Sequence, residues 1–188
     1  LEPIQGEGGV RPFSLKFLKK AKNLCEKNNI LFFLDEVQSG LGRSGKLFSY
    51  EWSNIEPDIM ALAKGIGSGF PMGACLASNK SCVGMTKGAH GSTFGGNALA
   101  MAVGSKVLSI ILKKGFLKNV DKVSRYLWDQ LKKIESDFNE ILEVRGAGLL
   151  LGIKTKSKNL KIIDLFFQNG LITLPCSDNI VRLAPPLT

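Results

Sequence analysis

The sequence predicts an α/β protein with a mainly parallel sheet, followed by a smaller α+β domain. Residues 30–34 form a continuous apolar run, as in a strand that is covered on both faces of a parallel sheet. Strand-like and helix-like segments alternate through the first half of the chain, which favours an α/β sheet. The pattern changes near residue 98, where long helices begin. We therefore place the large domain at residues 1–106 and the small domain at residues 107–188.

The large domain is predicted to contain one helix and four strands. The helix covers residues 13–27, because apolar residues recur at helical spacing and Asn28 and Asn29 follow as a stop signal. Short apolar segments predict strands at residues 1–5, 30–34, 58–63 and 74–77.

The chain from residue 98 onward is predicted to contain three helices and two strands. Residues 98–112 are rich in small side chains, and residues 116–134 keep apolar side chains three or four positions apart. A third helix covers residues 160–170 and closes with Gly170. Residues 144–154 and 179–186 are interpreted as strands.

Charge and composition exclude several classes of function. The net charge is +9, but the lysines are spread along the polar faces of the predicted helices, without interleaved aromatic residues. That distribution indicates solvated helix faces, with long-range attraction of small anions as a milder functional interpretation, rather than a nucleic-acid site. There is no apolar run that predicts a membrane partner, and four widely spaced cysteines with a single His predict no metal site. We expect a reduced, cytoplasmic protein.

Both ends of the sequence interrupt strand-like segments. The chain begins with "LEPIQ" and stops after "RLAPPLT". We therefore expect it to be an internal or C-terminal piece of a longer protein, which leaves organellar targeting open.

The stretch "LDEVQSGLGRSGK" at residues 34–46 has two interpretations. Residues 40–46 match G-x-x-x-x-G-K, and the acidic pair after the strand resembles a Walker B strand. A P-loop needs Ser or Thr after its Lys, however, and position 47 is Leu. The loop also follows the strand that it should precede. Nucleotide hydrolysis is therefore disfavoured.

Three short motifs suggest a different chemistry. Asp35 ends a buried strand, where a carboxylate needs a cationic partner such as a pyridinium nitrogen; a solvated Asp is the alternative. Lys64 follows the apolar "DIMALA" and precedes a glycine-rich turn, which suits a nucleophilic amine. Ser92 and Thr93 precede a predicted helix start, which suits either a phosphate or a simple capping turn.

Taken together, the motifs resemble a known family. They occur in this order: "EPIQGEGG", "LDEVQSGLGRSGKLFSYE", "PDIMALAKGIGSGFPMGA", "HGSTFGGN", "RGAGLLLGI", "VRLAPPL". This set resembles the class III, or omega-amino acid, aminotransferases of fold type I, which depend on pyridoxal 5'-phosphate (PLP). Within that family it is most similar to the acetylornithine group. The family usually has Thr where Ser39 and Ser44 stand and Pro where Ala98 stands.

The resemblance implies a cofactor site. Lys64 would bind PLP covalently as a Schiff base and move the proton between substrate and cofactor. Asp35 would pair with the pyridine nitrogen, Gln38 would bind the phenolic oxygen, and Val37 would pack on the ring. Thr93 would reach the phosphate in a neighbouring subunit, which implies a homodimer with shared active sites.

The resemblance also implies a substrate site. Arg182 would bind a substrate carboxylate, Glu7 would cover Arg182 when an amine-bearing end enters, and Ser92 would lie nearby. The implied reaction transfers an amino group from an omega-amino donor, N-acetylornithine first, to 2-oxoglutarate, in arginine biosynthesis. Ornithine or 4-aminobutyrate as donor, or a truncated non-catalytic chain, are the alternatives. The other phosphate loop, a ring-stacking aromatic residue and a second substrate arginine would precede Leu1, so we expect the chain alone to be inactive.

Overall fold

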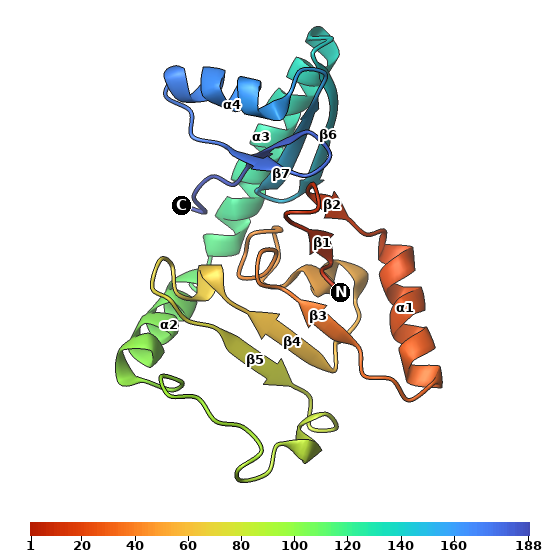
Figure 1. Cartoon of the computed structure of the whole chain (residues 1–188), viewed down its shortest axis with the longest axis vertical. Helices are drawn as coiled ribbons and strands as arrows, with labels where there is room; N and C mark the ends of the chain where they lie inside the picture. The colour runs from red at the N-terminus through yellow and green to blue at the C-terminus, as the bar shows by residue number, and fades with distance from the viewer.

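The structure is a computed structural model that describes residues 1–188. A three-stranded sheet and a four-stranded sheet occupy opposite ends of the long axis, and a short hairpin lies between them (Figure 1). We refer to the three-stranded β3-β4-β5 sheet as the first sheet and to the four-stranded β6-β7-β9-β8 sheet as the second sheet.

The first sheet is built from β3 (Phe33–Asp35), β4 (Ile59–Leu62) and β5 (Ala74–Ala77). The β3–β4 pairing is parallel and the β4–β5 pairing is antiparallel. The predicted strand at 30–34 starts later than expected. Ile30 still belongs to the preceding turn, since its N–H donates to the carbonyl of Cys25 at 2.8 Å, and the N–H of Phe32 is taken by Asp58 Oδ2 at 2.8 Å.

Helix α1 (Leu15–Lys27) covers one flank of the first sheet. Its ends follow from local chemistry: the Ser14 hydroxyl accepts from the N–H of Phe17 at 3.1 Å, and Asn29 adopts a left-handed conformation with φ 55° just after the helix. Lys22 and Asp58 form an ion pair at 3.0 Å that ties the helix to the start of β4.

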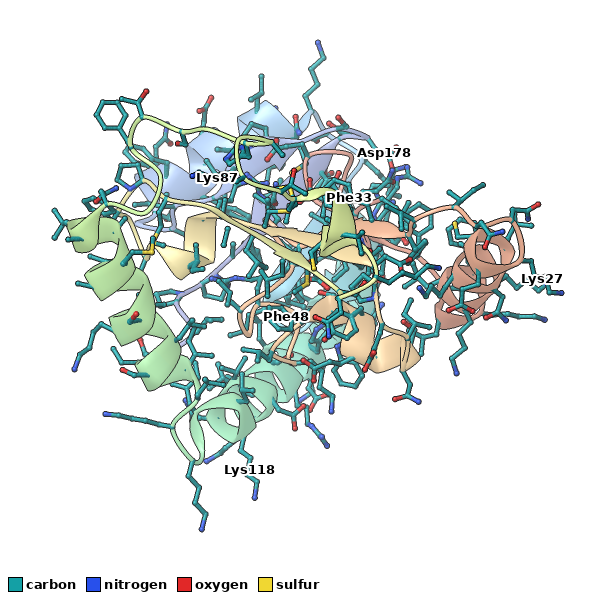
Figure 2. The ribbon with its side chains drawn as sticks, turned by 90° about the horizontal axis from the view of Figure 1, so that it is seen from below. Lys27, Phe33, Phe48, Lys87, Lys118 and Asp178 are labelled. Atoms are coloured by element: carbon teal, nitrogen blue, oxygen red, sulfur yellow. The ribbon has the colours of Figure 1, made fainter.

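Two helices connect the sheets: α2 (Ala98–Ile111), capped by the Asn97 side chain, and α3 (Phe116–Asp137). The division predicted between residues 106 and 107 falls within α2, and the assignment of domains stays a prediction. The lysines at the helix surfaces extend into solvent, as Lys27 on α1 and Lys118 on α3 show (Figure 2).

The second sheet corrects one prediction. Residues 144–154 are not a single strand, because β6 (Ile141–Ala147) and β7 (Leu150–Thr155) form an antiparallel hairpin. The tight turn uses Gly148 at φ 59° and carries none of the Asn-Gly or Asp-Gly signals that identify a hairpin in sequence. The sheet is completed by β9 (Ile180–Leu183) and by β8 (Leu174–Cys176), which was not predicted.

Each face of the second sheet has its own cover. Leu151, Ile153 and Val181 face α3 and α4 (Asn159–Gln168), together with Leu131 of α3. The opposite face is covered by the N-terminal hairpin of β1 (Ile4–Gln5) and β2 (Arg11–Pro12).

The N-terminal hairpin shares a core with the second sheet, although the sequence placed it in the large domain. Val10 is fully buried and packs with Ile4, Leu150 and Ile180. Because side chains alternate along a strand, Ile180 and Arg182 of β9 point to the same face of the sheet. The hairpin therefore brings its own turn, residues 6–10, beside Arg182.

The β6–β7 turn packs tightly against the loop that follows β3. A Cβ on Gly148 would lie 2.3 Å from the carbonyl carbon of Ser44, so only glycine fits there. The N–H of Leu149 donates to the carbonyl of Arg43 at 2.9 Å.

Short 3-10 helices cover Ser49–Ser53, Lys64–Ile66 and Cys82–Gly84. No helix combines the length and the apolar character needed to cross a membrane.

Candidate active site

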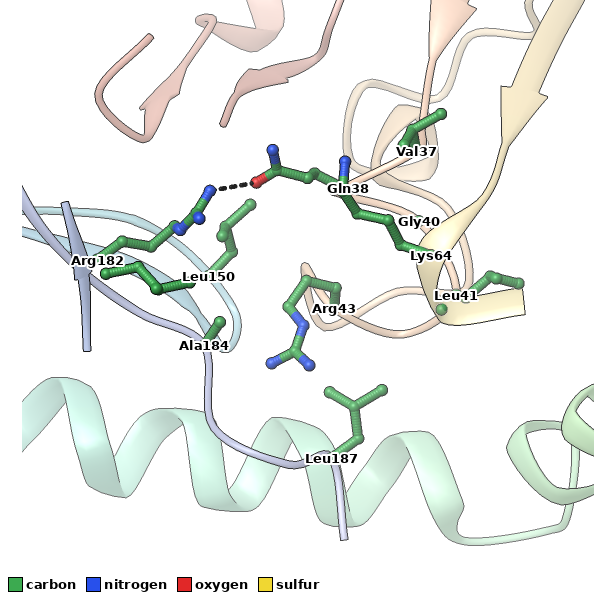
Figure 3. Close-up of a pocket in the computed structure, with 12 residues that line it drawn as sticks. Val37, Gln38, Gly40, Leu41, Arg43, Lys64, Leu150, Arg182, Ala184 and Leu187 are labelled. Carbon is green, nitrogen blue, oxygen red and sulfur yellow. Dashed lines mark hydrogen bonds between the residues drawn. The ribbon is translucent and has the colours of Figure 1, made fainter. Parts of the chain in front are cut away.

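A cavity of about 310 Å³ lies between the two sheets (Figure 3). The loop after β3 contributes Val37, Gln38 and Arg43, and the turn after β4 contributes Lys64. The second sheet contributes Arg182 from β9. Polar and cationic groups from both halves of the molecule thus converge on one space.

Arg182 is a largely buried, hydrogen-bonded cation of the cavity. Its side chain is 12% exposed, and its Nη1 donates to Gln38 Oε1 at 3.0 Å (Figure 3). Nη1 also donates to Glu7 Oε1. Gln38 Nε2 in turn donates to Glu7 Oε1 at 3.4 Å. The contact expected between Glu7 and Arg182 is present, and Gln38 joins it.

Neighbouring positive charge affects the pKa of Glu7 more than burial does. The hydrogen bond from Arg182 lowers its pKa, the positive charges of Arg182 and Lys64 act in the same direction, and partial burial opposes them. Its side chain is 70% exposed, whereas that of Arg182 is 12% exposed. Arg182 is therefore the fixed member of the pair and Glu7 the member that is free to rotate.

Asp35 and Lys64 lie at the same edge of the first sheet. Asp35 pairs with Ala61 across the parallel β3–β4 ladder, so the carboxyl ends of both strands meet there. Asp35 Oδ1 accepts from the N–H of Val37 at 2.9 Å, and Oδ2 has no hydrogen-bond partner in this chain. Asp35 does not itself line the cavity, but Val37, two residues further along the chain, does.

Lys64 departs from the sequence expectation in its surroundings. The apolar strand β4 ends at Leu62, and Lys64 leaves the sheet with φ 45°. Its side chain is exposed at the cavity rather than packed against apolar neighbours. Positive φ is uncommon outside glycine and is often found at functional positions.

Ser92 and Thr93 do not join the cavity. Both are exposed on the long segment between β5 and α2. Ser92 Oγ accepts from the N–H of Gly95 at 2.9 Å, and the start of α2 is capped by Asn97 instead. Within this chain the segment has the geometry of a capping turn, and the phosphate and substrate roles of Thr93 and Ser92 stay predictions.

The loop at residues 40–46 is not shaped to bind a phosphate. Ser44 is fully buried and accepts from the Ser49 hydroxyl at 2.8 Å, while Lys46 lies over the ring of Trp52, 5.0 Å from its centre. Only a short 3-10 helix follows, so no long helix N-terminus faces a ligand. The rejection of the P-loop interpretation agrees with this geometry.

Two residues of the site region were missed in the sequence. Arg43 lines the cavity and donates through Nη1 to the carbonyls of Leu149 and Pro185 at 3.1 and 2.6 Å, and its burial lowers the pKa of the guanidinium. Glu36 is 1% exposed, and its burial raises the pKa of the carboxyl. Arg43 lies within the G-x-x-x-x-G-K match and Glu36 within the Asp-Glu pair. Both matches pointed to nucleotide binding rather than to these contacts.

The residues at this edge fit PLP. Lys64 offers a primary amine for the aldehyde carbon of PLP, and Asp35 offers a carboxylate oxygen that has no hydrogen-bond partner in this chain. Val37 offers an apolar surface for a ring, and Gln38 offers a carboxamide. Gly40 and Gly65 also line the wall of the cavity.

Comparison with known proteins decides the family. The family model for aminotransferase class-III matches residues 1–188. The chain belongs to the class III aminotransferases. Members of this family use PLP and transfer amino groups.

The relatives of known name support a finer similarity. The chain is 50% identical to an acetylornithine aminotransferase of Mesorhizobium japonicum, over 100% of the chain and 47% of that protein. It is 48% identical to an acetylornithine aminotransferase of Brucella melitensis, again over 100% of the chain and 47% of the relative. The chain thus spans about half the length of the curated relatives that it matches.

Solved structures share the fold. An ornithine aminotransferase from Plasmodium yoelii superposes with a TM-score of 0.93 at 38% identity, covering 100% of this chain and 52% of that one. An N-acetylornithine aminotransferase from Stenotrophomonas maltophilia gives 0.87 at 38% identity, covering 100% and 50%. The α/β fold-type I prediction is confirmed for the half that is present.

Proposed function

We propose that this chain is the carboxyl-terminal part of an acetylornithine aminotransferase. The complete enzyme would transfer the δ-amino group of N-acetylornithine to 2-oxoglutarate, giving the semialdehyde and glutamate in arginine biosynthesis. The observation that carries this proposal is the cavity lined by Lys64, Gln38 and Arg182, with Glu7 bonded to Arg182 beside it. The identity of 43–50% to acetylornithine aminotransferases supports the choice of donor.

The cofactor half of the cavity would work through three residues. When bound, PLP supplies an electron sink for the carbon that carries the amino group. Lys64 Nζ would hold the cofactor and afterwards carry the proton to and from that carbon. Asp35 Oδ2 would accept a hydrogen bond from the pyridinium N–H and keep that proton in place. Gln38 would turn its Nε2 from Glu7 toward the phenolic oxygen.

The substrate half would work through the Glu7–Arg182 pair. N-acetylornithine presents a free amino group with its carboxylate remote, so a bare Arg182 beside the reacting carbon would have no partner. Glu7 satisfies Arg182 in that half-reaction. For 2-oxoglutarate the exposed Glu7 would swing away, and the planar guanidinium would bind the carboxylate in a bidentate manner.

The location, the oligomeric state and the alternative donors are proposed from the same similarity. The enzyme would be a cytoplasmic homodimer in which Thr93 and Ser92 serve the partner's site. Ornithine is the alternative donor, because ornithine aminotransferase structures superpose with TM-scores of 0.92 to 0.94. A chain that only dimerises without catalysis is the alternative of another class.

The test uses the complete enzyme that carries this chain. Borohydride reduction followed by peptide mapping is expected to place the pyridoxyl group on Lys64. Assays with N-acetylornithine, ornithine and 4-aminobutyrate are expected to give the highest kcat/KM for N-acetylornithine. A label on another lysine would remove the basis of the cofactor assignment, and a preference for ornithine would select the alternative donor.

A further inference from the structure

The turn that carries Glu7 is fastened to the second sheet through its backbone. The N–H of Ser177 donates to the carbonyl of Glu7 at 3.0 Å, and Arg145 Nε donates to the carbonyl of Gly9 at 2.8 Å. Gly9 has φ 102°, and a Cβ there would lie 2.8 Å from Arg145 Nη2. These contacts fix the point from which the Glu7 side chain extends.

Asp178 lies at the centre of these contacts. Its Oδ2 accepts from Arg145 Nη2 at 2.9 Å and from Arg11, and its Oδ1 accepts from Lys154 Nζ at 2.9 Å. The three cations come from β2, β6 and β7, so one carboxylate joins the N-terminal hairpin to the second sheet. The hydrogen bonds from Lys154 and Arg145 lower the pKa of Asp178 to about 2.

Asp178 also lies in the turn from which β9, the strand that carries Arg182, begins. Asp178 and Asn179 form the left-handed turn between β8 and β9, with φ 62° and 58°, and β9 carries Arg182. Asn179 Nδ2 donates to the carbonyl of Thr155 at 2.7 Å, which holds this turn against the end of β7. The turn between β8 and β9 thus helps to position both Glu7 and Arg182. It contacts the segment of Glu7 through Ser177 and Arg145, and it carries Arg182 because β9 begins there.

We propose that Arg145 and Asp178 position Glu7 against Arg182 and so set how strongly the site discriminates between an omega-amino donor and an α-amino donor. This inference rests on the proposed function. Neither residue lines the cavity, so both are positioning residues that act through the backbone at residues 7–9.

A purely stabilising role is the competing explanation, and the network allows the two to be separated. Arg145 also donates to Glu143 Oε2 at 3.0 Å and to the carbonyl of Gly9. Replacing Asp178 therefore does not leave the guanidinium without a partner. Asp178→Asn keeps the size of the side chain and removes the charge that joins the three cations.

The experiment measures kcat/KM in single-turnover half-reactions of the complete enzyme, with glutamate and N-acetylornithine as separate donors. Asp178→Asn and Arg145→Gln are expected to raise the glutamate-to-acetylornithine ratio in the direction of Glu7→Ala, by roughly two- to fivefold and by no more than Glu7→Ala itself. Arg145→Lys keeps the charge without the fork that reaches both acceptors, and is expected to fall in between. The double variant Glu7→Ala/Asp178→Asn should equal Glu7→Ala alone, because no Glu7 remains to be positioned.

A matched control lies outside the cavity. Lys22 and Asp58 form another partly buried ion pair, at 3.0 Å with side chains 11% and 13% exposed, and Lys22→Met is expected to lower stability without changing the ratio. The positioning role is overturned if the Asp178 and Arg145 variants slow both donors equally, or if their effects add to that of Glu7→Ala. If Glu7→Ala shifts the ratio and these variants do not, only the positioning role fails. If Glu7→Ala leaves the ratio unchanged, the proposed switch fails as well.

Discussion

Replacing Glu7 by Ala should change which substrate the enzyme prefers while leaving the fold nearly intact. Glu7 is 70% exposed, and ion pairs of exposed side chains contribute about 0–1 kcal/mol to stability. Arg182 keeps its hydrogen bond to Gln38 at 3.0 Å, so it is not left as a buried charge without a partner. We therefore expect the free energy of unfolding to change by less than about 1 kcal/mol.

The expected effect on selectivity follows from competition for Arg182. In the wild-type protein a substrate carboxylate must displace Glu7, and the two anions make hydrogen bonds of the same kind. Removing a competitor worth about 1 kcal/mol raises the fraction of free Arg182, and every 1.4 kcal/mol is about tenfold. Glu7→Ala is thus expected to raise kcat/KM for glutamate relative to N-acetylornithine by about fivefold.

Arg182→Ala provides the opposite perturbation. It removes the charged donor for 2-oxoglutarate, and hydrogen bonds to charged groups contribute about 1.5–3 kcal/mol, so kcat/KM for the oxo acid should fall by about 10- to 100-fold. N-acetylornithine should be affected less. Single-turnover absorbance of the cofactor measures each half-reaction, and Asp121→Ala, which breaks the 2.7 Å surface pair with Arg125, is the control. Equal losses in both half-reactions for both variants would refute the switch.

Three further predictions concern the cofactor, the dimer and the buried acid. Asp35→Asn should retain some cofactor but slow the half-reaction with the amino donor about a hundredfold, since such electrostatic contacts are worth about 3 kcal/mol or more; wild-type turnover would contradict the pyridinium assignment. Lys64→Ala and Thr93→Ala, each inactive, should complement when mixed, because both lesions fall in one site of the hybrid dimer; activity no higher than the better single variant, with subunit exchange verified, would argue against a shared site. Burial raises the pKa of Glu36 from its ordinary value of 4.5, so its contribution to stability is present below that value and is lost as pH rises through the folded-state pKa. Urea midpoints should accordingly show less loss of stability between about pH 5 and pH 8 for Glu36→Gln than for the wild type, and parallel curves would contradict this.

The sequence predicted the helices well because their signals are local. The stop signals at Asn28, Asn29 and Gly170 and the apolar spacing within each helix depend on residues within one or two turns. The β6–β7 hairpin was missed because "GAGLLLG" is apolar throughout, and because its turn is determined by the close approach of Gly148 to the loop at residues 43–45. No neighbouring residue carries that information.

The residues of the candidate site also divide into those with a local sequence signal and those without one. Glu7, Lys64, Gln38 and Arg182 could be selected from short motifs, and the structure brings all of them to one region. Arg43 could not be selected, because its role depends on carbonyl groups at Leu149 and Pro185, more than a hundred positions away. Long-range partners of a buried cation leave no periodic or spacing signal.

The meeting of Glu7 and Arg182 is a consequence of how the N-terminal hairpin is buried. The hairpin could have extended the first sheet, which follows it in the chain. Its fully buried Val10 instead packs on Leu150 and Ile180, on the face of the second sheet from which Arg182 projects. Alternation along β9 then places Ile180 in the core and Arg182 at the cavity, two positions further on. The apolar contact of Val10 thus brings together an acid and a base that are 175 positions apart in the chain. Selectivity at Arg182 should therefore respond to the packing of this hairpin as well as to Glu7 itself.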